Sequence, residues 1–281
     1  MTGPRPDAQT ARAARTAWLC AAPLLALTAA AVLGPFAWRS ASASLACARE
    51  AGCEALLTPY YLQAVVNTLL IATLSSLLVL PVALAACAAA VRQPAWAAPL
   101  RWLGSLGANF AGVPLALSFT LMFGVQGVIT QLLGGGTALR LDGFSGLLAA
   151  YLCFQLPLAV LLLLAPVQML DGALEEAAAT LGAARGVYWR RVALPLLAPS
   201  LIEVGVLLFA NAAAAYATPF AMAGSNANML AVRLTALVSG DLFADPRLPP
   251  LLALLLFALL SAVMLLGRAV TQALGRRTGR A

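Results

Sequence analysis

Long runs of apolar residues, separated by short polar segments, dominate the chain. Six runs are close to or above the length of helix that crosses the hydrocarbon core of a bilayer, about 20 residues. Their approximate ranges are 17–38, 61–91, 102–129, 144–167, 196–220 and 250–266. The third run is interrupted by Gly112 and Pro114, and both residue types weaken a helix. The pattern predicts an all-α membrane protein with about six transmembrane helices.

Composition agrees with this prediction and excludes several kinds of site. Hydrophobic residues make up 62% of the 281 positions and charged residues 10%, whereas a soluble domain carries about 25% charged residues. All 17 basic residues are arginine, because the sequence contains neither Lys nor His. A P-loop nucleotide site requires Lys, and His is absent as a general base or metal ligand. The arginines are dispersed between apolar runs, which argues against nucleic acid as a partner despite the net charge of +7.

The placement of the arginines predicts the direction of the spans. With the N-terminus inside the cell, 12 of the 17 arginines fall in inside segments and 5 in outside segments, as the positive-inside rule requires. Both termini are then cytoplasmic, as tails over 1–16 and 269–281. Between them we expect a first helix and outside loop over 17–58 and a transmembrane domain over 59–268. A cleaved signal peptide is the alternative for the first span, since Ala41-Ser42-Ala43 follows the apolar stretch.

Two cysteines, Cys47 and Cys53, lie in the predicted first outside loop. That compartment permits disulfides, so a bridge between them is one interpretation and two unpaired thiols are the other. No cysteine spacing in the chain matches a metal site.

The inside segment 171–195 differs from the other inside loops. Strong helix formers fill positions 170–181, and Gly182 follows at the position where glycine ends helices. A second short helix is predicted over 188–192, before Pro195 at the start of the fifth span. The segment presents both charge signs and two aromatic residues. It is therefore either a docking surface for a partner or an amphipathic connector whose arginines touch lipid head groups.

The same segment resembles the EAA loop of ABC importer permeases. The family pattern is Glu-Ala-Ala, three residues, Gly, nine residues and Ile-x-Leu-Pro, and this chain departs from it only by Val in place of Ile. The matching positions are Glu176, Ala177, Ala178, Gly182, Val192, Leu194 and Pro195. Asn67-Thr68-Leu69-Leu70 is similar to the start of the family's transmembrane module. Segment 216–220 and the predicted outside stretch 237–241 resemble the polyamine, thiamine or ferric-ion branch of such importers. The spermidine/putrescine type is the nearest of these.

The resemblance implies the fold of methionine-importer-like permeases and a division of labour. The chain would be a permease subunit in the cell inner membrane, working with a second permease subunit, a cytoplasmic ABC ATPase dimer and an external substrate-binding protein. It would be surrounded by membrane lipid, would not itself be an enzyme and would need no cofactor. Glu176 would pair with a basic group of the ATPase, Ala177 and Ala178 would allow close approach, and Gly182 would set the bend. A polyamine or similar small solute is the implied cargo.

Glu203 and Asn211 are polar residues within the predicted fifth span. At about 1.5 Å rise per residue, Glu203 lies roughly 10 Å below the cytoplasmic end, where an acid is costly unless it faces protein or water. The two residues lie about 80° apart around a helix, so they share a broad face. They line a translocation path, or Glu203 pairs with a neighbouring helix near the interface. A secondary, ion-coupled transporter is the alternative function, although inverted repeats typical of that class are not evident.

Overall fold

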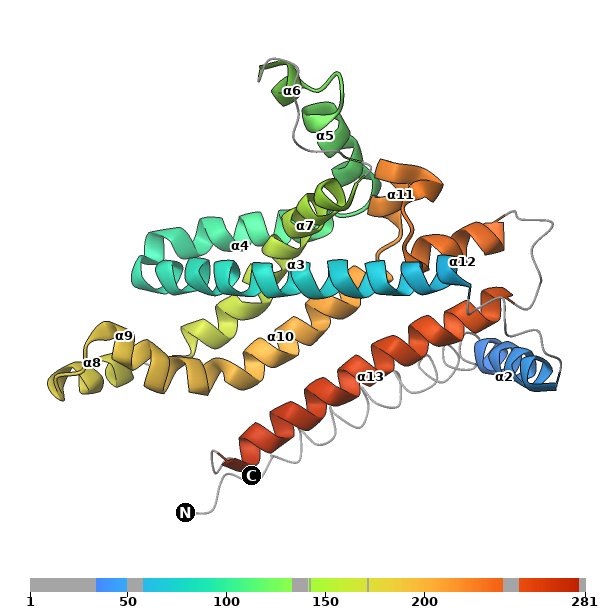
Figure 1. Ribbon diagram of the computed structural model, residues 1–281. Helices are drawn as coiled ribbons and strands as arrows, with labels where there is room; N and C mark the ends of the chain where they lie inside the picture. The colour runs from blue at the N-terminus through green and yellow to red at the C-terminus, as the bar shows by residue number, and fades with distance from the viewer. Residues whose placement is uncertain are drawn as a thin grey trace, which may run out of the picture.

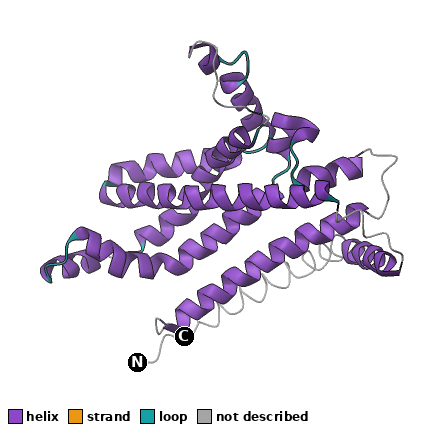
Figure 2. Ribbon diagram, in the orientation of Figure 1, coloured by secondary structure: helices purple, strands orange, loops and turns teal. Residues whose placement is uncertain are grey.

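The computed structural model describes residues 34–49, 58–132, 141, 143–170, 172–239 and 248–277. These residues form helices joined by short loops, without strands (Figure 2). In chain order the α-helices are α2 (Gly34–Arg49), α3 (Pro59–Arg92), α4 (Pro94–Asn109), α5 (Val113–Phe123), α6 (Val128–Leu132), α7 (Phe144–Gln168), α8 (Gly172–Thr180), α9 (Arg185–Tyr188), α10 (Leu194–Ala214), α11 (Ala217–Ala223), α12 (Leu230–Ser239) and α13 (Leu248–Arg277).

Within the described residues, five segments are long and apolar enough to cross a membrane. They are Pro59–Arg92, Val113–Leu132, Phe144–Gln168, Arg185–Ala214 and Leu248–Leu274. These segments correspond to the second to sixth predicted spans. The first predicted span, 17–38, lies largely outside the described residues.

Three of the predicted boundaries were wrong. The apolar run 102–129 is divided, because its first residues belong to α4 and the membrane-length segment begins only at Val113. The fifth span ends at Ala214 rather than at residue 220. The sixth extends beyond residue 266 to Arg277, since the helix continues after the apolar run has ended.

Helix α7 forms the centre of the bundle and packs against α3, α4 and α10. Its side chains are buried on several faces, including Tyr151, Leu163 and Gln155. The contact with α4 is close, because a Cβ added to Gly107 would lie 2.5 Å from Pro157 Cγ. Small residues at such crossings allow membrane helices to approach one another. Gln155 Nε2 donates to the carbonyl oxygen of Leu208 at 3.2 Å, which ties α7 to α10.

Two interrupted helices meet on one side of the bundle. The backbone breaks between α4 and α5, where Gly112 has φ +86°, and again between α10 and α11. Thr218 on α11 joins the two breaks, since its Oγ1 accepts a hydrogen bond from Gly112 N at 3.0 Å. Helices α5 and α11 lie against one another as a result (Figure 1). Irregular backbone at membrane depth is tolerated where protein or a water-filled cavity satisfies it.

Helix α12 was not predicted from the sequence, which was interpreted there as an outside stretch over 237–241. Its start is held by α3. Thr68 Oγ1 accepts a hydrogen bond from Leu230 N at 2.9 Å, and Asn67 Nδ2 donates to the carbonyl oxygen of Asn228 at 3.1 Å. Asn67 and Thr68 therefore have a structural role. They connect α3 to the start of α12, which lies more than 160 residues later in the chain.

Candidate functional site

The segment between α7 and α10, residues 172–195, is called the α8–α9 bend below. Helix α8 ends in a hydrogen-bonded C-cap. Gly182 N donates to the carbonyl oxygen of Ala179 at 2.9 Å, and Ala183 N donates to that of Ala178 at 3.0 Å. This is the Schellman pattern, which requires a residue in the left-handed region after the cap. Gly182 has φ +74°, so the predicted glycine bend is confirmed.

The motif residues of α8 lie on an accessible surface. Glu176 and Ala177 are exposed and Ala178 is partly exposed, while no heavy atom lies within 4 Å of a Cβ built on Gly182. Leu181 is 87% exposed, next to this glycine. Single exposed apolar side chains are common on protein surfaces, and Val125 and Met169 are exposed to a similar degree. The exposure of Leu181 therefore bears on a partner only together with the motif residues beside it. The sequence pattern placed Leu181 only in a helix and did not predict this exposure.

A salt bridge joins the two arms of the bend. Arg185 Nε on α9 lies 3.3 Å from Glu175 Oε1 on α8. Both side chains are substantially exposed, so solvent screens the attraction and the pair contributes little to stability. The pair spans the bend from α8 to α9. Glu175 therefore faces its own chain, whereas the neighbouring Glu176 has no recorded ion pair among the described residues.

The second arm of the bend continues directly into α10. Sequence analysis predicted a separate short helix over 188–192, but α9, a π-helical turn (Trp189–Ala193) and α10 form one run, Arg185–Ala214. Leu194 N donates to the carbonyl oxygen of Trp189, five residues earlier. Pro195 follows within the first turn of α10. Proline has no N–H to continue the usual ladder, and the π-helical turn accommodates that loss. Val192 and Leu194 are partly buried, while Pro195 is exposed.

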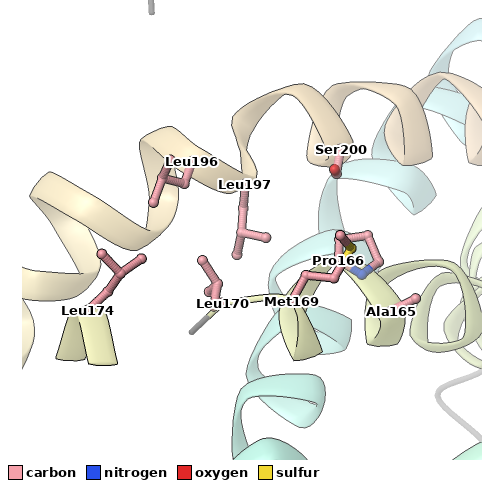
Figure 3. Close-up of a pocket in the computed structure, with 8 residues that line it drawn as sticks. All are labelled: Ala165, Pro166, Met169, Leu170, Leu174, Leu196, Leu197 and Ser200. Atoms are coloured by element: carbon pink, nitrogen blue, oxygen red, sulfur yellow. The ribbon is translucent and has the colours of Figure 1, made fainter. Parts of the chain in front are cut away.

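An apolar hollow of about 460 Å³ lies between α8, the end of α7 and the start of α10. Its lining includes Leu174 on α8, and Leu196 and Leu197 on α10 face Leu174 across the gap (Figure 3). Helix α8 packs mainly against α9. Helix α8 therefore borders this hollow on one side and contacts the rest of the chain mainly through α9.

Glu203 and Asn211 are both exposed on α10. Together with Leu207 they are spaced four residues apart, so they form one stripe along the helix. Glu203 also lines a hollow of about 260 Å³ with Arg268 of α13. Glu203 and Arg268 therefore border the same hollow, and no salt bridge joins them.

The proposed cysteine bridge falls outside the described residues, because Cys53 is not among them and nothing is described of the Cys47 side chain. Cys87 and Cys153 are free thiols. Within the described residues, no group of three or more His, Cys, Asp or Glu side chains is placed to hold a metal ion.

Sequence comparison finds two curated relatives. The chain is 29% identical over 163 residues to the probable ABC transporter permease protein y4fN of Sinorhizobium fredii, matching 57% of this chain and 28% of that protein. It is 35% identical over 105 residues to the trehalose transport system permease protein SugB of Mycobacterium tuberculosis, matching 36% and 38%. The chain thus matches well under half the length of these relatives. No protein-family model matches it.

Two solved structures share the fold along nearly the whole chain. One is a bacterial ABC transporter that imports the acidic polysaccharide alginate, with a TM-score of 0.69, 14% identity and coverage of 94% of this chain and 99% of that chain. The other is a bacterial alginate ABC transporter in complex with a periplasmic protein bound to alginate pentasaccharide, with a TM-score of 0.69, 16% identity and coverage of 95% and 97%. The chain is thus similar in sequence to two ABC transporter permeases and shares its fold with two bacterial ABC transporter structures.

Proposed function

We propose that the chain is the permease subunit of an ABC importer and receives movement from a separate ATPase through the α8–α9 bend. The observation that carries this proposal is the exposed surface of α8. There the motif residues Glu176 and Ala177 stand beside Leu181 and Gly182, and Leu181 is 87% exposed.

The bend has the parts that mechanical coupling requires. The small side chains of Ala177 and Ala178 let a partner approach the α8 backbone, and Glu176 offers a charge for a basic group of that partner. Leu181 supplies an apolar anchor. Because α9 continues into α10 as one helical run, a displacement of the bend is passed directly to a membrane span. Val192, Leu194 and Pro195 shape that junction.

The proposal includes three kinds of protein partner. A cytoplasmic ABC ATPase dimer hydrolyses the nucleotide, so this chain carries no catalytic site. A second permease subunit, the same or different, completes the path across the inner membrane. An external binding protein delivers the substrate, and a periplasmic protein carries the alginate oligosaccharide in one of the structural neighbours. Both termini of the chain lie in the cytoplasm in this arrangement, as the arginine distribution favours.

We assign the α10 stripe of Glu203, Leu207 and Asn211 to the translocation path. The stripe is exposed in the single chain and carries polar groups at membrane depth, which are rare outside pathways. For the cargo, the names of the relatives favour a saccharide over the polyamine suggested by short sequence similarities. A ligand panel of sugars and polyamines, applied to the cognate binding protein, decides between them.

Charge reversal at Glu176 tests the coupling role. We expect Glu176→Arg to abolish copurification of the ATPase and transport, because it places a cation against the partner's basic group. Gln93→Arg is the matched control, since it adds the same side chain to an exposed position between α3 and α4, away from α8. Normal transport and undiminished copurification of the Glu176→Arg variant would refute the proposal. An ion-coupled transporter has no specific observation in its favour here.

A further inference from the structure

A third hollow lies between the end of α3 and the start of α9. Its volume is about 740 Å³. Arg92, the last residue of α3, and Arg185, the first residue of α9, both line it. Trp189 adds an indole ring to the same wall. The hollow therefore combines two guanidinium groups with an aromatic side chain of the type found at membrane–water interfaces.

Away from the arginines the wall is apolar. It follows one side of α3 from Pro81 past Ala85 and Ala88 to Arg92, with Leu194 opposite. Eleven residues of helix span about 16 Å, which is close to half the thickness of the hydrocarbon core. Ala85 and Arg92 are exposed, so the hollow is open at the side of the bundle. Its depth and lining suit a hydrocarbon chain with a charged group at one end.

The charge at that end is unbalanced. Arg185 shares one carboxylate, Glu175, with which it forms the salt bridge of the bend. No described carboxylate pairs with Arg92. Two guanidinium groups beside one carboxylate leave a net positive end, and guanidinium groups bind phosphate well.

We propose that this hollow binds one anionic phospholipid, with its phosphate between Arg92 and Arg185 and an acyl chain along α3. Basic pockets between membrane helices are suited to anionic head groups. The assignment of this lipid to the cytoplasmic leaflet rests on the proposed function. Because Arg185 is bound to Glu175 on α8, the bound head group lies one side chain away from the proposed ATPase-docking helix and stiffens the bend.

Two other occupants fit the hollow less well. A protein that docks from the water phase reaches the arginines but not the far end of the apolar wall at Pro81, about 16 Å deeper. A polar solute in transit would meet a wall that offers it no hydrogen-bonding side chain between Pro81 and Arg92. A phospholipid fits both parts of the hollow, because its phosphate can meet the arginines and its acyl chain can lie along the apolar wall.

The test uses the full chain, without any ATPase, in phosphatidylcholine vesicles that contain a minor fraction of phosphatidylglycerol. One of the two lipids carries bromine on its acyl chains and quenches nearby tryptophan. The contribution of Trp189 is the difference between the unaltered chain and a Trp189→Phe variant. At about 1 kcal/mol per arginine near a charged surface, two arginines give a preference for the anionic lipid of roughly tenfold or more.

We expect Arg92→Gln, which leaves the salt bridge of the bend intact, to lower this preference severalfold, and Arg92→Gln/Arg185→Gln to abolish it. Arg190→Gln/Arg191→Gln is the matched control, because both residues adjoin Trp189 but do not line the hollow. Ala88→Leu, which fills the wall and keeps both charges, should reduce quenching by either lipid.

Equal quenching by the two lipids, or an equal loss of preference in the two double variants, would overturn the proposal. So would unchanged quenching in Ala88→Leu, a variant that tests the hollow even if removal of both arginines prevents folding. A chain that prefers the anionic lipid here but never copurifies with an ATPase would refute the proposed function and leave this inference standing.

Discussion

The guanidinium carbon of Arg233 lies 4.2 Å from the centre of the Tyr60 ring. Arg233 Nε also donates to Asn228 Oδ1 at 2.9 Å, and Asn228 Nδ2 donates to the carbonyl oxygen of Tyr60 at 3.3 Å. The first turn of α3 and the first turn of α12 are thus held by one cation, one ring and one amide. The cluster lies at the end of α3 opposite Arg92 and the α8–α9 bend.

Removal of the ring should loosen this cluster. We expect Tyr60→Leu to lower the free energy of unfolding by about 0.5–1 kcal/mol, the value of an exposed cation–π contact. Tyr60→Phe keeps the ring and should be neutral. Thermal unfolding of the detergent-solubilised protein measures both variants, and a loss of stability in Tyr60→Phe equal to that in Tyr60→Leu would contradict the role of the ring.

Removal of the Thr68 hydroxyl should uncap α12. Thr68 is fully buried, and Thr68→Val keeps its shape but leaves the Leu230 N–H without its acceptor. The cost of a buried unsatisfied donor is about 1–3 kcal/mol. Hydrogen exchange at the Leu230 amide should accelerate correspondingly in this variant. Thr68→Ser retains the hydroxyl, so exchange there should stay slow, and equal acceleration in both would show that packing rather than the hydrogen bond protects this amide.

A side chain with a Cβ at position 182 should strain the bend. We expect Gly182→Ala to destabilise the left-handed cap by about 1–2 kcal/mol, which opens the angle between α8 and α9 and weakens ATPase binding. Gly182→Asn is the informative comparison, because Asn tolerates this conformation better. Affinity for the ATPase, measured by titration, should fall more for Ala than for Asn. The reverse order would mean that space at this position, rather than backbone conformation, decides binding.

Leu181 should matter for binding and not for folding. Because its side chain is 87% exposed, Leu181→Ser removes almost no buried surface from the single chain and should leave the unfolding temperature unchanged. If a partner covers this side chain, the lost burial of about 1.5–3 kcal/mol weakens the complex by roughly tenfold to a hundredfold. Val125→Ser, at another highly exposed position, is the control and should bind the ATPase normally. Unaltered binding by Leu181→Ser would remove Leu181 from the docking surface.

The sequence predicted those features that depend on neighbouring residues. Five of the six predicted spans correspond to membrane-length segments of the described residues, although three of their boundaries were wrong. The bend was predicted from Gly182, because a glycine that follows a run of strong helix formers favours a local helix cap. The interruption of the third run was predicted from Gly112 and Pro114, and the structure breaks the helix there, between α4 and α5.

The features that the sequence did not reveal depend on distant contacts. The run 196–220 remains largely apolar beyond Ala214, so its hydropathy cannot show that the helix stops there. That break is stabilised by Thr218, whose partner Gly112 is 106 residues away. The start of α12 likewise depends on Thr68, 162 residues earlier. The exposure of Leu181 and the net charge of the lipid-sized hollow appear only when α8, α9 and α3 are placed together.

The single hydroxyl of Thr218 has a mechanical consequence. It links Gly112 to α11, and so makes the interruptions of two different crossings into a shared pivot. Under the proposed function, a pull that enters α10 from the α8–α9 bend would reach this pivot at the far end of that helix. The hydrogen bond between Thr218 and Gly112 would then pass the movement to α5 and α11 together.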